Sequence, residues 1–287
     1  MINLKGLGVA LITPFDKNND VDFIALEKVI NHIKKDIDYL IVFGTTSEAP
    51  TLTEKEKAEI LKKIKSLYAD HIILGIGGYN TKEVIEKIKS QDFKQIDAIL
   101  SVAPYYNKPN QKGLIAHFEA IANNSPVPIV LYNVPSRTSS NLEAATTLKL
   151  AQHPNIIAIK EASGNFAQIM KIIQNKPDDF VVVSGDDALT LPLMSIGVEG
   201  LISVIGNAYP KITRNIVKSI LKGDLHNAQK FHYKLLPLIE AIFKEGNPAG
   251  IKALLSIKGL IQNNLRLPLV PVSNNLVEEI KNIIKHI

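Results

Sequence analysis

The 287-residue sequence contains no cysteine and only three arginines, at positions 137, 214 and 266. The absence of cysteine excludes disulfide bonds, thiolate metal sites and a cysteine nucleophile. The formal net charge of +5 arises from lysines that are interleaved with glutamates, as in residues 54–65, which is typical of a solvated helix face. No basic segment is interleaved with aromatic residues, so we expect no nucleic-acid partner.

Long apolar runs and linkers are also missing. No run approaches the roughly 18 to 20 apolar residues of a membrane helix, and the N-terminal segment lacks the features of a signal peptide. We therefore expect a cytoplasmic protein without membrane association. With 46% hydrophobic and 21% charged residues and no Gly/Ser-rich or Pro-rich linker, the chain is expected to be globular.

Common cofactor motifs are incomplete. Residues 75–80 begin like a dinucleotide fingerprint but lack its last glycine, and no phosphate-binding Walker loop or HExxH motif is present. The seven histidines show no clear ligand spacing. We predict neither a metal nor a cofactor.

Short β-branched runs alternate with stretches in which apolar residues recur every three or four positions. The predicted strands are residues 8–13, 39–44, 72–77, 98–103, 128–133, 156–161, 181–185 and 200–204. This pattern predicts an α/β fold, a TIM (β/α)8 barrel over residues 1–223, with a doubly wound sheet as the alternative. Thr53 and Glu56 form a predicted capping box before one helix. Helical patterns at 231–243, 251–261 and 276–284 predict a small C-terminal helical domain over residues 224–287.

Lys160 lies near the end of an apolar run, Ile156–Glu161, that reads as a buried strand. An ammonium removed from water loses hydration energy, and the neutral amine favoured instead is a nucleophile for carbonyl groups. The structural alternative is a lysine that reaches water or pairs with Glu161 or with another carboxylate.

Other polar residues collect where predicted strands end, the position of catalytic groups in such barrels. They are Gly44 to Glu48, Tyr105 and Tyr106, Tyr132 to Thr138, and Asp186 and Asp187. Each has a simpler interpretation: helix capping at 44–47 and 186–187, a core aromatic at 132 and a surface cation at 137. One reaction that uses an amine, a hydroxyl relay, a carboxylate site and a second cation would account for them together.

Six segments carry a family resemblance over nearly the whole chain: GTTSEAPTLT, APYYNKPNQKGL, LYNVPSRT, IKEASG, SGDD and LRLPLVPVS. They resemble the dihydrodipicolinate synthase family, now called 4-hydroxy-tetrahydrodipicolinate synthase, within the pyruvate-dependent class I aldolase superfamily that also contains N-acetylneuraminate lyase. The resemblance implies a barrel with a C-terminal helical domain, assembled as a homotetramer. It also implies condensation of pyruvate with L-aspartate 4-semialdehyde, in lysine and diaminopimelate biosynthesis.

The resemblance also implies the residue roles. Lys160 matches the Schiff-base lysine, so no other cofactor is expected. Tyr132 matches a proton-relay tyrosine, and Thr45 links it to Tyr106, which reaches the site of a neighbouring subunit. Thr46 matches the pyruvate-carboxylate site and Arg137 the cation for the semialdehyde carboxylate. Gly185 and Ile202 match positions that line the site.

Some positions depart from the family. Ser47 replaces the usual glycine, so the local backbone is expected to differ slightly. Lysine-inhibited relatives often have serine, alanine, two histidines and asparagine where this chain has Ala49, Pro50, Glu54, Lys57 and Tyr79. Because Lys57 would repel an effector's ammonium groups, we predict weak or absent inhibition by lysine, although Glu83 and Tyr105 are retained.

Two alternative functions stay open on the sequence. One is a sister aldolase acting on a sialic acid or a 2-keto-3-deoxy sugar acid, against which Arg137 and the double threonine favour a small anionic aldehyde. The other is a catalytically inactive binding or scaffolding barrel. Retention of Lys160, Tyr132, Thr45 and Tyr106 as a set argues against it.

Overall fold

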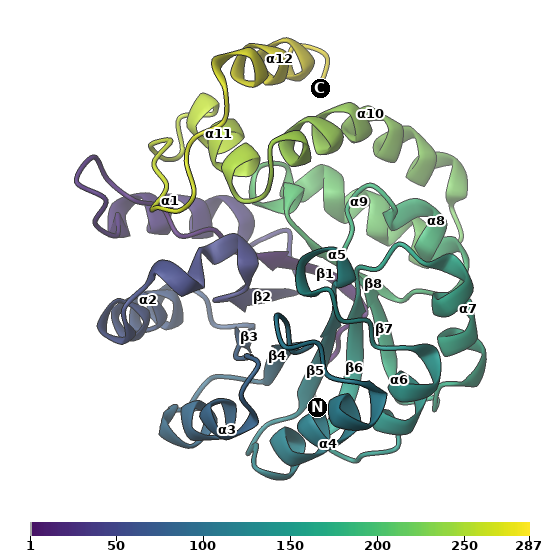
Figure 1. Ribbon diagram of the computed structural model, residues 1–287. Helices are drawn as coiled ribbons and strands as arrows, with labels where there is room; N and C mark the ends of the chain where they lie inside the picture. The colour runs from purple at the N-terminus through teal and green to yellow at the C-terminus, as the bar shows by residue number, and fades with distance from the viewer. Residues whose placement is uncertain (1) are drawn as a thin grey trace. The chain divides into compact units, whose positions relative to one another are not determined.

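The computed structural model describes residues 2–287, and within them eight parallel strands form a closed barrel in the order β1 to β8. Figure 1 shows the strands and helices alternating along the chain. The strands are β1 (Gly6–Ala10), β2 (Tyr39–Val42), β3 (His71–Gly75), β4 (Ala98–Val102), β5 (Ile129–Asn133), β6 (Ile156–Glu161), β7 (Val181–Ser184) and β8 (Gly200–Ser203). The predicted TIM barrel is confirmed, and the doubly wound alternative is wrong.

The largest error in strand position is at β1, which was predicted over residues 8–13 and ends at Ala10. The apolar run continues because Leu11 and Ile12 are buried beyond the strand. The backbone N–H of Ile12 donates to the side-chain oxygen of Asn207 instead of a neighbouring strand. Burial is therefore visible in the sequence, whereas the end of the ladder is set by a distant side chain.

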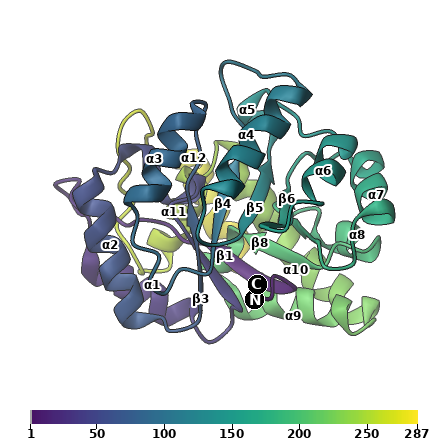
Figure 2. The same cartoon turned by 90° about the horizontal axis from the view of Figure 1, so that it is seen from below.

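The chain divides into two compact units, which are described separately. The first comprises the segment that ends at Gly6 together with His71–Ile202. In Figures 1 and 2, β4 to β7 lie side by side with α4, α6 and α7 on their outer side. The helices of this unit are α3 (Thr81–Ser90), α4 (Gln111–Asn123), α5 (Pro135–Thr138), α6 (Ala144–Leu150), α7 (Phe166–Asn175) and α8 (Thr190–Ser195).

The register of β5 and β6 fixes which side chains meet. Tyr132 is opposite Lys160, and Asn133 is opposite Glu161. Successive side chains of a strand point to opposite faces, so the first pair and the second pair lie on different sides of the sheet. β5 is buried along its whole length, as the apolar run predicted.

The second compact unit comprises Leu7–Asp70 and Ser203–Ile287. Its helices are α1 (Phe23–Ile33), α2 (Glu54–Leu67), α9 (Pro210–Leu221), α10 (Leu225–Lys244), α11 (Ala249–Ile257) and α12 (Asn274–Ile284). Three short 3-10 turns are η1 (Thr45–Ser47), η2 (Ala49–Thr51) and η3 (Ile205–Asn207). In Figure 1, α10, α11 and α12 form the yellow-green C-terminal region, in which α10 packs against both α11 and α12.

Local sequence signals locate several helix ends in this unit. The capping box predicted at Thr53 and Glu56 is present at the start of α2, whose buried residues are Ile60, Leu61 and Ile64. The predicted C-terminal helical region is confirmed. α11 ends four residues before the predicted position, because Gly259 adopts the left-handed conformation, with φ of 71°. The domain boundary at residues 223 and 224 remains a prediction.

Candidate active site

Lys160 and Tyr132 lie together at the carboxyl-terminal ends of β6 and β5 in the first unit. Lys160 is 7% exposed, and its Nζ is 4.2 Å from the centroid of the Tyr132 ring. The ring is itself buried. The structure therefore brings together the predicted nucleophile and the ring of the predicted proton-relay tyrosine on one face of the sheet.

Gly185 leaves the space that the lysine side chain occupies. A Cβ atom at this position would lie 2.7 Å from Lys160 Cε and 2.9 Å from Ala162 Cβ. These distances are well below van der Waals contact, so a larger residue would displace Lys160. Ile202, the last residue of this unit, is buried in β8.

Glu161 does not pair with Lys160. Its carboxylate accepts hydrogen bonds from the side chains of Asn133 and Gln168 and from the backbone N–H of Ser163. Burial raises the pKa of this carboxyl group, while these hydrogen bonds oppose the rise. Within residues 2–287 Lys160 forms no ion pair, so the alternative of a lysine neutralised by Glu161 is wrong.

Sequence reasoning missed the polar network behind this pair. Asn133 and Gln168 also form hydrogen bonds with the side chain of Asn141. The side-chain oxygen of Asn133 accepts from the backbone N–H of Leu142. Because Asn133 and Glu161 directly follow Tyr132 and Lys160, this network holds the two strands in register behind the reactive pair. The sequence signal that could have indicated this network is Glu161, an acid next to Lys160 at the end of an apolar run, which needs hydrogen-bond donors when it is buried.

The loops after β5 and β7 carry charged groups. Arg137 is exposed on the short helix α5, which begins at Pro135. Asp186 accepts from the backbone N–H groups of Ala188 and Leu189 in the turn before α8. The N-cap residue of α8 is Leu189, without a side-chain cap hydrogen bond, so Asp186 stabilises this turn and does not cap the helix. Asp187 is buried.

Three tyrosines form a cluster on the surface of the first unit. The ring of Tyr79 lies 5.1 Å from that of Tyr105 and 6.2 Å from that of Tyr106. Tyr106 is 85% exposed and has a positive φ of 67°. A large aromatic side chain held outward by an uncommon backbone conformation is a feature of interaction surfaces.

The predicted carboxylate site is in the second unit, where η1 follows β2. Thr46 and Ser47 are buried, whereas Thr45 is exposed. Ser47 fits without strain: its hydroxyl donates to the Leu11 carbonyl oxygen, and its own carbonyl oxygen accepts from Thr13. The residues with positive φ between β2 and η2 are Phe43, with φ of 61°, and Glu48, with φ of 53°, so Ser47 does not occupy a position that requires glycine.

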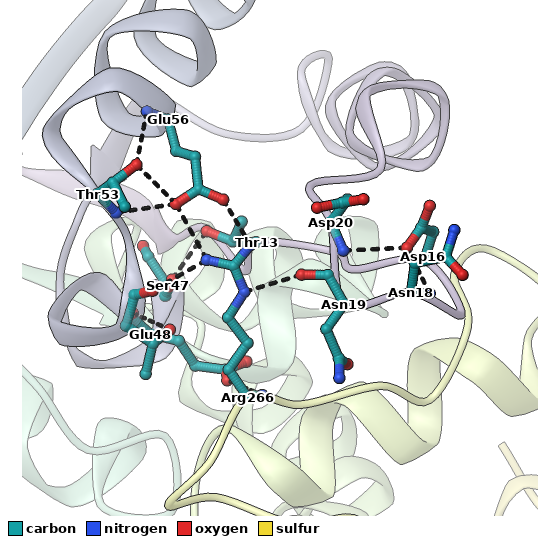
Figure 3. A network of polar contacts seen from close by, with 11 residues as sticks. Thr13, Asp16, Asn18, Asn19, Asp20, Ser47, Glu48, Thr53, Glu56 and Arg266 are labelled. Atoms are coloured by element: carbon teal, nitrogen blue, oxygen red, sulfur yellow. Dashed lines mark hydrogen bonds and ion pairs between the residues drawn. The ribbon is translucent and has the colours of Figure 1, made fainter.

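The C-terminal region contacts this loop through residues that sequence reasoning also missed. The side-chain amide of Asn247 donates to Thr46 Oγ1 at 3.1 Å. Glu48 forms a fully buried ion pair with Lys252 of α11 and accepts from the backbone N–H of Arg266. Figure 3 shows Arg266 reaching from its loop to both carboxylate oxygens of Glu56.

Within residues 2–287 no cluster of three or more histidine, aspartate or glutamate side chains is arranged to hold a metal ion. None of the helices in this range combines the length and the apolar character needed to cross a bilayer.

Comparisons with known proteins agree with this geometry. The model of the dihydrodipicolinate synthetase family matches residues 3–287. The 4-hydroxy-tetrahydrodipicolinate synthase of Parabacteroides distasonis is 49% identical, covering 100% of this chain and 98% of the relative. The 4-hydroxy-tetrahydrodipicolinate synthase of Azobacteroides pseudotrichonymphae is 51% identical, covering 98% of this chain and 96% of the relative. A crystal structure of dihydrodipicolinate synthase from Acinetobacter baumannii complexed with pyruvate is 36% identical, with a TM-score of 0.95 over 99% of each chain. The full-length family match and the barrel together establish that this chain belongs to the dihydrodipicolinate synthetase family of enzymes.

Proposed function

We propose that this chain condenses pyruvate with L-aspartate 4-semialdehyde to give 4-hydroxy-tetrahydrodipicolinate, in lysine and diaminopimelate biosynthesis. The observation that carries the proposal is the buried Lys160, which lies over the Tyr132 ring with space reserved for it by Gly185. The names of the relatives support the same reaction. We place this reaction in the cytoplasm.

The reaction begins at Lys160. Its neutral amine attacks C2 of pyruvate, and loss of water leaves an imine. The imine accepts the electrons released when a methyl proton leaves, which gives an enamine. The enamine carbon then forms a bond to the aldehyde carbon of the semialdehyde. Attack by the substrate's amino group on C2 closes the ring and releases Lys160 as the free amine.

The other residues bind the substrates and move protons. Thr46, with its backbone N–H, receives the pyruvate carboxylate, and Gly185 and Ile202 line the pocket for the imine. Arg137 receives the carboxylate of the semialdehyde, which suits its planar guanidinium. Tyr132 passes protons at the imine through Thr45 to Tyr106.

The relay implies that the enzyme works as an assembly. Tyr106 is the most exposed aromatic residue of its cluster and is held outward by its backbone. We propose that it enters the site of a neighbouring subunit, within a homotetramer built as a dimer of dimers. A free monomer would then lack one end of the relay.

Borohydride trapping tests the function. Protein treated with pyruvate and borohydride is digested and mapped by mass spectrometry, and semialdehyde turnover is measured on the same preparation. An adduct on Lys160 with turnover supports the synthase. An adduct without turnover indicates a sister aldolase, and the absence of any adduct contradicts both.

A further inference from the structure

The C-terminal region holds the loop that carries Thr46. Asn247 lies between α10 and α11, is buried, and donates from Nδ2 to Thr46 Oγ1 at 3.1 Å. Two residues further along the loop, Glu48 is buried beside Lys252. The contacts therefore join a side chain of the proposed carboxylate site to the part of the chain after residue 246.

The direction of the hydrogen bond has a chemical consequence. A threonine hydroxyl has one proton to donate and two lone pairs. Because Asn247 donates to the oxygen, it occupies a lone pair and leaves the hydroxyl proton for another acceptor. Within residues 2–287 that proton has no acceptor. A carboxylate is an acceptor only, so it complements a hydroxyl arranged in this way.

The ion pair fixes the turn that follows Thr46. Glu48 adopts the left-handed conformation between η1 and η2. One carboxylate oxygen contacts Lys252 Nζ, and the other accepts from Arg266 N–H at 3.1 Å. Lys252 also donates to the Asn264 carbonyl oxygen at 3.0 Å. A buried carboxylate held from two directions cannot move without leaving a charge uncompensated, so the loop has one position.

Arg266 extends this hold along the loop and onto α2. It donates through Nη1 to the Thr51 carbonyl oxygen at 2.9 Å and forms a bidentate pair with Glu56. Figure 3 shows Arg266 paired with Glu56, whose carboxylate also accepts from Thr53. The C-terminal residues thus contact the segment from Thr46 to Glu56 at its beginning, middle and end.

We propose that Asn247 is a positioning residue for pyruvate: it orients the Thr46 hydroxyl so that its proton points to the substrate carboxylate, while the Lys252–Glu48 pair fixes the loop on which Thr46 lies. The proposal rests on the proposed function, since it deepens the role assigned to Thr46. Asn247 itself touches no reacting atom and acts through Thr46.

Asn247→Asp tests the proposal because it keeps the size of the side chain and replaces the donor by an acceptor. The Thr46 proton would then be drawn to the new carboxylate, which also repels the substrate. We expect the KM for pyruvate to rise by about 10- to 100-fold, the range for a hydrogen bond to a charged group. The KM for the semialdehyde should stay within about twofold, since Arg137 is unchanged. Asn282→Asp, on the exposed surface of α12, is the matched control for the added charge.

A double-mutant cycle keeps the test decisive if Asn247→Asp fails to fold. Asn247→Ala should raise the KM for pyruvate in the native background and have no further effect on it in a Thr46→Val background. Equal effects in both backgrounds, or an unchanged KM in Asn247→Asp, would overturn the positioning role. Trapping at Lys160 in the native protein separates the two proposals. If the native protein forms the pyruvate adduct but the Asn247 variants keep the native KM for pyruvate, only this inference is contradicted. If the native protein forms no adduct, the proposed function is contradicted, and this inference with it.

Discussion

Lys160 and Lys252 are both buried, and both place Nζ close to an aromatic ring, 4.2 Å from the centroid of Tyr132 and 4.1 Å from that of Phe15. Their charged surroundings differ. Lys252 pairs with Glu48 and donates to a backbone carbonyl oxygen. Lys160 forms no ion pair within residues 2–287, and Glu161 bonds to amides on the other face of its strand.

This difference separates a structural lysine from a reactive one. Burial lowers the pKa of Lys252 to about 8, and the attraction of Glu48 opposes that effect. A carboxylate at this distance favours the protonated lysine, whose nitrogen has no lone pair for attack on a carbonyl group. Lys252 therefore serves to hold a loop. An amine without such a partner is free to form a bond to a carbonyl carbon.

The largest expected effect comes from substituting the two lysines one at a time and comparing adduct formation and turnover. Lys160→Ala should abolish the pyruvate adduct and lower kcat by about 1,000-fold or more, as loss of a covalent nucleophile does. Lys252→Met should still form the adduct at Lys160. Borohydride trapping and initial-rate kinetics on both variants make the measurement. Trapping at Lys252, or turnover by Lys160→Ala near the native rate, would contradict the assignment.

Lys252→Met should instead damage stability, because it leaves the Glu48 carboxylate buried without a cation. The expected loss is about 3–5 kcal/mol in the free energy of unfolding, measured by urea denaturation. Glu48→Gln combined with Lys252→Met removes both charges and should recover much of this loss. If Lys252→Met alone unfolds at the native midpoint, the pair does not hold the loop.

Gly185→Ala tests how closely the space around Lys160 is defined. The added Cβ would lie 2.7 Å from Lys160 Cε, so the side chain must shift by a substantial fraction of an ångström. Misplacement on this scale is expected to lower kcat by about 10- to 100-fold. Gly78→Ala, where the added Cβ would meet only the end of the Val84 side chain at 3.3 Å, is the control. A native kcat in Gly185→Ala would contradict this expectation, because it would show that the added Cβ does not displace the Lys160 side chain.

His117 is a third buried basic group, and in the part of the chain that the structure describes it has no carboxylate partner. Its Nδ1 contacts the Thr81 hydroxyl, and burial lowers its pKa from 6.5 to about 4. A base whose folded-state pKa is depressed stabilises the fold above the unfolded value, and this contribution is lost as the pH falls from 6.5 toward 4. We expect the native protein to lose on the order of 1–2 kcal/mol from this group between pH 7.5 and 5. His117→Asn should reduce that loss when urea midpoints are compared at the two pH values. An identical pH dependence in the variant would contradict this.

The smallest effect is expected from added lysine. Lys57 forms an ion pair with Glu54 at 2.8 Å on α2, so a cation stands at a position where relatives that respond to lysine often carry histidine. Repulsion between this cation and the ammonium groups of lysine predicts little change in activity. A submillimolar inhibition constant in initial-rate assays would contradict the prediction.

The sequence predicted the eight strands, the capping box of α2 and the helical C-terminal region, because each depends on periodicity or on residues close together in the chain. It also identified Lys160 and Tyr132, which the structure brings together. The family resemblance supplied the roles of the site residues, which remain to be tested: Tyr132, Thr45, Thr46, Tyr106, Arg137, Gly185 and Ile202. Asn247, Asn133 and Gln168 were missed, since their partners are distant in the sequence.

Lys252 and Lys160 both lie among apolar neighbours in the sequence. Lys252 interrupts the apolar segment of α11 much as Lys160 interrupts that of β6. Of the two, only Lys160 was singled out from the sequence, because it lies in a short run in which every neighbour toward the N-terminus is apolar. The burial of Lys252 was not predicted and is a finding of the structure. Only the tertiary structure decided which of them is neutralised. That outcome depends on whether folding brings a carboxylate within a few ångströms, and Glu48 reaches Lys252 whereas Glu161 faces away from Lys160.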